Sequence, residues 1–164
     1  MTKILSKEYI ETILNEIPDP EIPVISIVDL GIVRKVILED SKVIVHITPT
    51  YSGCPAMMAI QKDIVSRLNK EGIEQVEVKL VVDEVWTTDW INEEARERLR
   101  QYGIAPPEKV SSDKNVLMGK SKTVSCPRCG SEHTVLISQF GSTACKALYR
   151  CENCREPFDY FKCH

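Results

Sequence analysis

The sequence predicts an α+β chain with two folded parts, a mixed α/β domain followed by a small all-β module. In the first part, apolar residues recur alternately at helical and at strand spacing. In the second part, two Cys-x-x-Cys pairs are separated by 21 residues. A stretch rich in proline and serine lies between the two parts. We therefore expect a first domain over residues 1–104, a linker over 105–120 and a metal-binding module over 121–164.

The first domain is expected to begin with a helix and a β-hairpin. Apolar residues at helical spacing lie between Ser6, a favourable helix cap, and Pro18, which ends the helix. Residues 32–38 and 43–48 are rich in β-branched residues and predict two strands. The short polar turn between these strands predicts a hairpin.

A second helix, a third strand and a third helix are expected to complete this domain. Pro55 suits the first position of a helix, whose apolar stripe continues until Gly72 ends it. Residues 76–82 have the pattern of a half-buried strand. Residues 90–102 predict a helix, because acids come early, arginines come late and Gly103 stands where a C-terminal cap belongs.

The two cysteine pairs predict a structural zinc site. Each pair places two thiolates on a tight turn, and two such turns supply four sulfurs about 2.3 Å from a tetrahedral Zn²⁺. Residues 134–138 and 147–150 predict short strands between the turns, the pattern of a zinc ribbon. A module of about 45 residues buries too small a core, so zinc should supply much of its folding free energy. The predicted ligands are Cys126, Cys129, Cys151 and Cys154.

Other potential ligands in the module are expected to be spectators. Cys145, Cys163 and His164 could extend the metal site or bind a second ion, but four thiolates already complete a tetrahedral zinc. His133 could replace a thiolate, yet the four cysteines leave it no vacancy.

Cys54 lies far from these four cysteines and is the candidate functional thiol. It falls at the N-cap of the predicted second helix, where free N–H groups and the helix dipole lower a thiol pKa below its usual value of about 8.5. This position favours a reactive or metal-binding thiol. The alternative is a small buried residue that caps the helix.

Asp19 and Glu21 lie two residues apart in a turn that Pro20 and Pro23 restrict. They could orient Cys54 or a metal. As ordinary surface residues of a turn they would need no function, and the residues alone favour this plainer interpretation. A nucleophile with a neighbouring base is not evident.

Charge and composition exclude some classes of function. The net charge is −3, with −5 on residues 1–120 and +2 on residues 121–164, so a dense basic stripe for nucleic acid is missing. No apolar run approaches the ~18 residues of a membrane span, and the first ten residues lack the apolar core of a signal peptide. Seven cysteines, mostly in metal spacing, agree with a reducing compartment. We therefore expect a cytoplasmic protein.

Several motifs resemble known families. DPEIP at 19–23, DLG at 29–31 and TPTYSGCP at 48–55 resemble the iron-sulfur cluster assembly domain family, over about residues 5–103. The resemblance narrows to the PaaD family of the phenylacetyl-CoA epoxidase system through VWTTDWI at 85–91, YGIAPP at 102–107, FGSTACK at 140–146 and the ribbon. The departure is Ile22, where many relatives place histidine or tyrosine.

The resemblance implies a non-catalytic factor that helps to mature the ring-epoxidising oxygenase of aerobic phenylacetate degradation. Cys54 is then the functional thiol, and Asp19 and Glu21 match the acidic turn of the family. Zinc is the structural cofactor, and a transient iron-sulfur cluster or iron is the cargo. The implied partners are the oxygenase and reductase subunits, with the reductase as the obvious client, and a homodimer is left open.

Two other interpretations are kept. One is a thiol-dependent enzyme that uses Cys54, with Asp19 or Glu21 as the proton acceptor. The other is a zinc-ribbon module that binds nucleic acid or protein, and the missing basic stripe disfavours nucleic acid.

Overall fold

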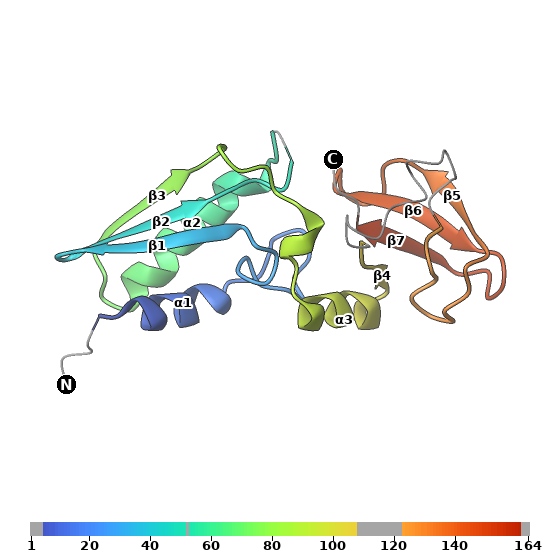
Figure 1. The fold of residues 1–164 in the computed structure, drawn as a ribbon, viewed down its shortest axis with the longest axis horizontal. Coiled ribbons are helices and arrows are strands. Elements are labelled where there is room, and N and C mark those ends of the chain that lie inside the picture. The colour runs from blue at the N-terminus through green and yellow to red at the C-terminus, as the bar shows by residue number, and fades with distance from the viewer. Residues whose placement is uncertain (1–4, 52, 108–122, 162–164) are drawn as a thin grey trace. The chain divides into compact units, whose positions relative to one another are not determined.

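The computed structural model describes residues 5–51, 53–107 and 123–161, and the fold is α+β as predicted (Figure 1). The chain divides into two compact units, residues 1–86 and 87–164. The helix α3 (Glu93–Tyr102) and the strand β4 (Ile104–Ala105) therefore fall in the second unit, although the sequence placed α3 in the first domain. Most of the predicted linker lies outside the described residues, so the three-part division stays a prediction.

The first unit contains a three-stranded sheet in the order β1-β2-β3. β1 (Val33–Glu39) and β2 (Lys42–Ile47) form the predicted antiparallel hairpin. β3 (Gln75–Leu80) pairs with β2 in parallel, and α2 (Ala56–Lys70) provides the long crossover that parallel strands require. The parallel pairing places the carboxyl ends of β2 and β3 at the same edge of the sheet.

Two helices pack against this sheet and form its core. The helix α1 (Lys7–Asn15) begins as predicted at Ser6, whose Oγ accepts a hydrogen bond from the Tyr9 N–H at 3.2 Å. α1 packs against β1, α2 packs against β3, and the two helices also contact each other. Apolar side chains from both helices and the sheet are buried, among them Ile10, Leu14, Val43, Val45, Ile60, Ile64 and Leu68. None of the described helices is long and apolar enough to cross a lipid bilayer.

The second unit contains a four-stranded sheet in the order β4-β7-β6-β5, whose last three strands are drawn in orange and red in Figure 1. β5 (Thr134–Ser138) has the bounds that the sequence predicted, and β6 (Lys146–Cys151) extends the predicted strand at both ends. The sequence missed β7 (Pro157–Phe161) and the two-residue β4, which pairs with β7 in parallel.

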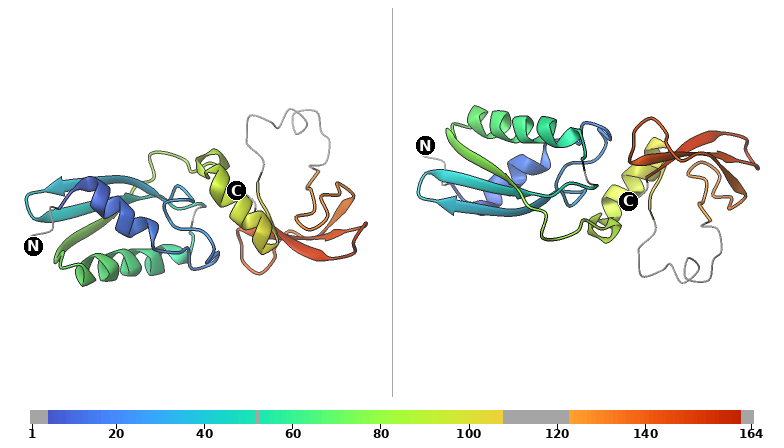
Figure 2. Two further views of the ribbon diagram at one scale, coloured as in Figure 1. Left: turned by 90° about the horizontal axis from the view of Figure 1, so that it is seen from below. Right: turned by 90° about the horizontal axis from the view of Figure 1, so that it is seen from above.

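The helical part of the second unit starts with a short 3-10 helix, η1 (Thr88–Trp90), and Figure 2 shows it directly before α3. Asn92 caps α3 by accepting a hydrogen bond from the Ala95 N–H at 2.7 Å. Gly103 ends α3 in the left-handed conformation, with φ of 93°, as the sequence predicted. The structure thus starts the α-helix at Glu93, three residues later than expected.

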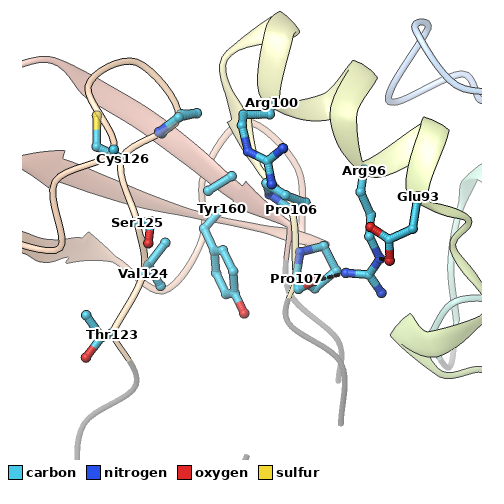
Figure 3. A pocket seen from close by; sticks show the side chains of 13 residues that line it. Glu93, Arg96, Arg100, Pro106, Pro107, Thr123, Val124, Ser125, Cys126 and Tyr160 are labelled. Atoms are coloured by element: carbon cyan, nitrogen blue, oxygen red, sulfur yellow. Dashed lines mark hydrogen bonds and ion pairs between the residues drawn. The ribbon is translucent and has the colours of Figure 1, made fainter. Parts of the chain in front are cut away.

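Arg96 is a buried charge that joins these segments. Its guanidinium donates hydrogen bonds to the backbone carbonyls of Thr88 at 2.6 Å and Ile91 at 3.4 Å. It also donates to the carbonyl of Pro107, as Figure 3 shows. Its side chain is 7% exposed, and a carboxylate oxygen of Glu93 lies 3.8 Å from its Nε. Because a buried charge needs such partners, we assign Arg96 a structural role that holds η1 and the chain after β4 against α3.

Candidate functional site

The four cysteines of the ribbon converge on one point. Their sulfur atoms all lie within 4.8 Å of one another. The Sγ atoms of Cys126 and Cys154 are 3.7 Å apart, and those of Cys129 and Cys151 are 3.5 Å apart. A tetrahedral zinc with Zn–S bonds of about 2.3 Å requires sulfurs about 3.8 Å apart. The geometry of the four thiols therefore fits a single Zn²⁺.

The remaining ribbon residues with metal-binding side chains do not join this group where the structure describes them. Cys145 is buried, and the Thr143 hydroxyl lies 3.0 Å from its sulfur. His133 is exposed and is not part of the four-cysteine group. Cys163 and His164 lie outside the described residues, so their predicted role as spectators stays a prediction.

Both cysteine pairs are shaped by the same kind of turn. The residue directly after each second cysteine adopts a left-handed conformation, with φ of 73° at Gly130 and 62° at Arg155. In the first turn, the Gly130 N–H also donates to the Cys126 carbonyl at 2.9 Å. Glycine adopts this conformation without strain, whereas another residue costs about 1 kcal/mol. The repeated geometry indicates that both turns serve the same purpose, the presentation of two thiolates to a metal.

Hydrogen bonds reach two of these sulfurs, those of Cys129 and Cys151. The backbone N–H of Ser131 and the side-chain amide of Asn153 lower the pKa of Cys129 to about 6. The Cys154 N–H donates to the sulfur of Cys151 at 3.5 Å. Such contacts stabilise the negative charge that a metal-bound thiolate retains.

A cavity of about 400 Å³ lies beside the first cysteine turn (Figure 3). Its walls include Arg96 and Arg100 of α3, together with Cys126 and Tyr160. Arg96 is bound to backbone carbonyls, and Arg100 forms an ion pair with Glu97 on the same helix. The arginines at this cavity are thus engaged in contacts that stabilise the unit.

Cys54 lies in the loop between β2 and α2, at the sheet edge where the parallel strands end. The N-cap of α2 is Pro55, so the prediction of Cys54 as the N-cap is wrong by one residue. Pro55 already has helical dihedral angles, φ −69° and ψ −21°, which explains the small difference. Gly53 adopts a φ of 76°, and the Cys54 N–H donates to the Tyr51 carbonyl at 3.3 Å. This turn leaves Cys54 half-buried rather than fully buried.

The environment of Cys54 raises the pKa of its thiol. Burial makes the largest contribution, and the carboxylates of Glu21 and Asp19 raise the pKa further. Hydrogen bonds from the Ala56 N–H and the Tyr51 side chain oppose this only in part. The sequence-based expectation of a thiol with a lowered pKa is therefore wrong, because burial and two carboxylates from a distant turn outweigh the helix N-terminus.

The turn that contains Asp19 and Glu21 is held in place by hydrogen bonds and burial. Asp19 is only 6% exposed, and its Oδ1 accepts hydrogen bonds from the N–H groups of Glu21 at 2.9 Å and Ile22 at 2.8 Å. This arrangement is an Asx turn, in which the carboxylate fixes the backbone two and three residues ahead. Ile22 is buried in the core and anchors the turn. The view of Asp19 as an ordinary surface residue is therefore wrong, and the charges of Asp19 and Glu21 act on the thiol of Cys54.

These three side chains do not form a preassembled metal site. Within the described part of the chain, the ribbon cysteines are the one group of three or more ligands that lie within mutual reach. Tyr51 adds a hydrogen bond to the thiol that sequence reasoning did not assign. The only signal for Tyr51 was its place in a run of hydroxyl residues just before the cysteine.

A Glu21→Gln variant should make Cys54 more reactive. Removing this carboxylate lowers the pKa of Cys54, so its thiolate fraction, and with it the alkylation rate, should rise at a given pH. The midpoint of the pH–rate profile should move to lower pH, measured by iodoacetamide labelling and peptide mass. Glu39→Gln, at the far end of the hairpin, is the control and should leave the profile unchanged. An unshifted profile in Glu21→Gln would contradict the electrostatic explanation.

Comparisons with known proteins relate the two parts of the chain to two families. Residues 7–80 match the family model of the iron-sulfur cluster assembly protein, and residues 110–162 match that of the PaaD zinc beta ribbon domain. An Escherichia coli K12 protein, named as the D subunit of 1,2-phenylacetyl-CoA epoxidase, is 54% identical over 151 residues, which are 92% of this chain and 89% of that protein. The chain belongs to the PaaD family.

Other relatives each align with a little more than half of the chain. A Porphyromonas gingivalis protein named Fe-S protein maturation auxiliary factor is 34% identical over 92 residues, 55% of this chain and 87% of that protein. The crystal structure of a domain of unknown function, DUF59, from Bacillus anthracis has a TM-score of 0.53 at 26% identity, covering 57% of this chain and 90% of its own. A conserved hypothetical protein from Thermotoga maritima has a TM-score of 0.52 at 33% identity, covering 60% and 98%. These matches confirm the predicted α+β fold.

Proposed function

We propose that this PaaD-family chain is an accessory factor that helps to load an iron-sulfur cluster or iron into a component of phenylacetyl-CoA epoxidase. The observation that carries the proposal is a half-buried thiol, Cys54, that experiences the charges of Asp19 and Glu21 within the domain that matches the cluster assembly family. The likeness to an iron-sulfur maturation factor and membership in the PaaD family support it.

The chemistry of the Cys54 site suits brief binding of a cationic cargo. The thiol is protonated at neutral pH because its pKa is raised, and a bound metal would displace that proton. The negative charges of Asp19 and Glu21 destabilise a thiolate that has no metal bound, but they attract a cation to the site. Resident clusters are usually held by four cysteine thiolates, and this site offers one thiol. A cargo held by so few ligands can pass to a client that supplies the remaining thiolates.

The same electrostatics disfavour the alternative of a thiol-dependent enzyme. A catalytic cysteine is usually activated by a lowered pKa or by an adjacent base. At Cys54, both neighbouring carboxylates raise the pKa instead. We therefore keep a non-catalytic role within the proposal, with zinc as the structural metal of the ribbon and the reductase as the first client to test.

Cells that lack this chain provide the test. Oxygenase and reductase subunits purified from them should be inactive and deficient in iron and sulfide, and chemical reconstitution with iron and sulfide should restore activity without this chain. Iron and sulfide content per subunit, together with epoxidase turnover, would be measured before and after reconstitution. Fully metallated subunits that stay inactive until this chain is added back would instead indicate a stoichiometric component of the reaction complex.

A further inference from the structure

The outer edge of β3 has no strand paired with it in the described part of the chain. β3 is the last strand in the order β1-β2-β3, and Figure 1 shows it at the margin of the sheet. Leu80 at its end is 49% exposed. A groove of about 810 Å³ is lined by Val78 of β3 and by residues of α2, among them Val65, Lys62 and Lys70. An unpaired strand edge is a template for another strand.

The backbone groups that point outward from β3 can be identified. The Val81 N–H donates to the Ile47 carbonyl of β2 at 2.8 Å, so the backbone groups of Val81 point toward the sheet. In a strand, the N–H and C=O of one residue point to the same side, and those of the next residue point to the opposite side. The outward groups are therefore those of Val76, Val78 and Leu80.

The charges of β3 select one way for two copies of this strand to pair. In an antiparallel pair centred on Val78, Glu77 lies opposite the partner's Lys79, and Lys79 lies opposite the partner's Glu77. A pair centred on Glu77 or on Lys79 would place like charges opposite each other, which is destabilising. Only the register centred on Val78 combines opposite charges with hydrogen bonding between the outward groups of Val76, Val78 and Leu80.

The two faces of β3 also suit this register. Val78 lines the groove, so Val76 and Leu80, two residues away on either side, share its face beside α2. In the dimer, Leu80 would lie opposite the partner's Val76 and lose its exposure. Glu77 and Lys79 lie on the other face, where Glu77 contacts Lys42 as well as Lys79. The charged pairs would therefore remain near solvent, while the apolar pairs would extend the core.

We propose that this chain forms a symmetric dimer through the edges of two β3 strands, antiparallel and centred on Val78. The three-stranded sheets of two copies then join into one continuous sheet, with the two α2 helices side by side. The dimer does not depend on the maturation role, and a failed dimer would leave that role untouched.

Charge reversal tests the proposal on the full zinc-loaded chain. In Lys79→Glu, Glu77 would lie opposite a glutamate of the partner, and in Glu77→Lys, Lys79 would lie opposite a lysine. Each variant alone should self-associate about tenfold more weakly than the wild type, because two cross-strand pairs turn from attractive to repulsive. An equimolar mixture of the two variants should recover association, since both positions then oppose acid to base. Sedimentation velocity over a concentration series up to about 100 µM would measure this.

Two further variants sharpen the result. Lys35→Glu reverses a charge on β1 at the opposite edge of the sheet and should leave the dimer intact. Leu80→Lys leaves both charge pairs in place but removes the apolar contact with the partner's Val76, so it should weaken the dimer. Circular dichroism would verify that each variant retains its fold. The proposal would be overturned if the wild type were monomeric, even if it bound an added extended peptide at this edge. It would also be overturned if the equimolar mixture of Lys79→Glu and Glu77→Lys failed to associate.

Discussion

Removal of the ribbon metal is expected to unfold the sheet of the second unit while the first unit stays folded. The small core of the ribbon includes two of the metal ligands, Cys126 and Cys151, beside Phe158 and Tyr160. Structural zinc contributes about 10–16 kcal/mol of apparent binding free energy in zinc-finger peptides, more than a core of this size can replace. Without the metal, four thiols would also be packed together with nothing to bind. The first unit has its own buried core around Ile10 and Leu14 and should not need the metal.

The measurement combines metal analysis with NMR. Purified protein should contain about one zinc per chain, as expected for a single four-cysteine site. Treatment with a strong chelator, or the substitution Cys126→Ser, should collapse the amide signals of β5–β7 into the narrow range of unfolded chains. Cys145→Ala removes a ribbon cysteine outside the four-cysteine group and should keep these signals. Iron alone in the site, with visible charge-transfer absorption, would overturn the zinc assignment.

The sequence predicted correctly those features of the fold that depend on residues close together in the chain. Ser6 caps α1, and Gly103 ends α3, because each position requires a residue of that type for its own turn of the chain. The two Cys-x-x-Cys turns were predictable for the same reason, since each turn is closed within a few residues. The pairing of β4 with β7 was not predictable, because two residues carry too little pattern and their partners lie more than fifty residues further on.

The candidate site shows the same division between local and distant causes. Sequence placed Cys54 within one residue of its position at the start of α2, because Pro55 and the apolar stripe mark that start. The direction of the pKa shift was wrong, because burial and the carboxylates of Asp19 and Glu21 come from tertiary contacts. The helix N-terminus is a local feature visible in the sequence, whereas the acidic turn lies more than thirty residues before the thiol.

A Cys54→Ser variant is expected to abolish growth on phenylacetate while the protein folds normally. Serine is nearly isosteric with cysteine, and the thiol is only half-buried, so the fold should tolerate the change. A serine hydroxyl does not supply the thiolate that iron and iron-sulfur clusters prefer. Client subunits from these cells should be deficient in iron and sulfide, as in cells that lack the chain.

Two further variants distinguish the contribution of the Cys54 thiol to growth from the contributions of other residues. Cys145→Ala also removes a cysteine, but from the ribbon, and should preserve growth. Glu21→Gln keeps the thiol and removes one carboxylate that favours a cation, so growth should be slowed rather than lost. If Cys54→Ser cells grew normally on phenylacetate with fully metallated clients, the thiol would have no part in delivery. The role of the chain would then rest on surfaces of the two units that act without Cys54, as in a component that only binds its partner subunits.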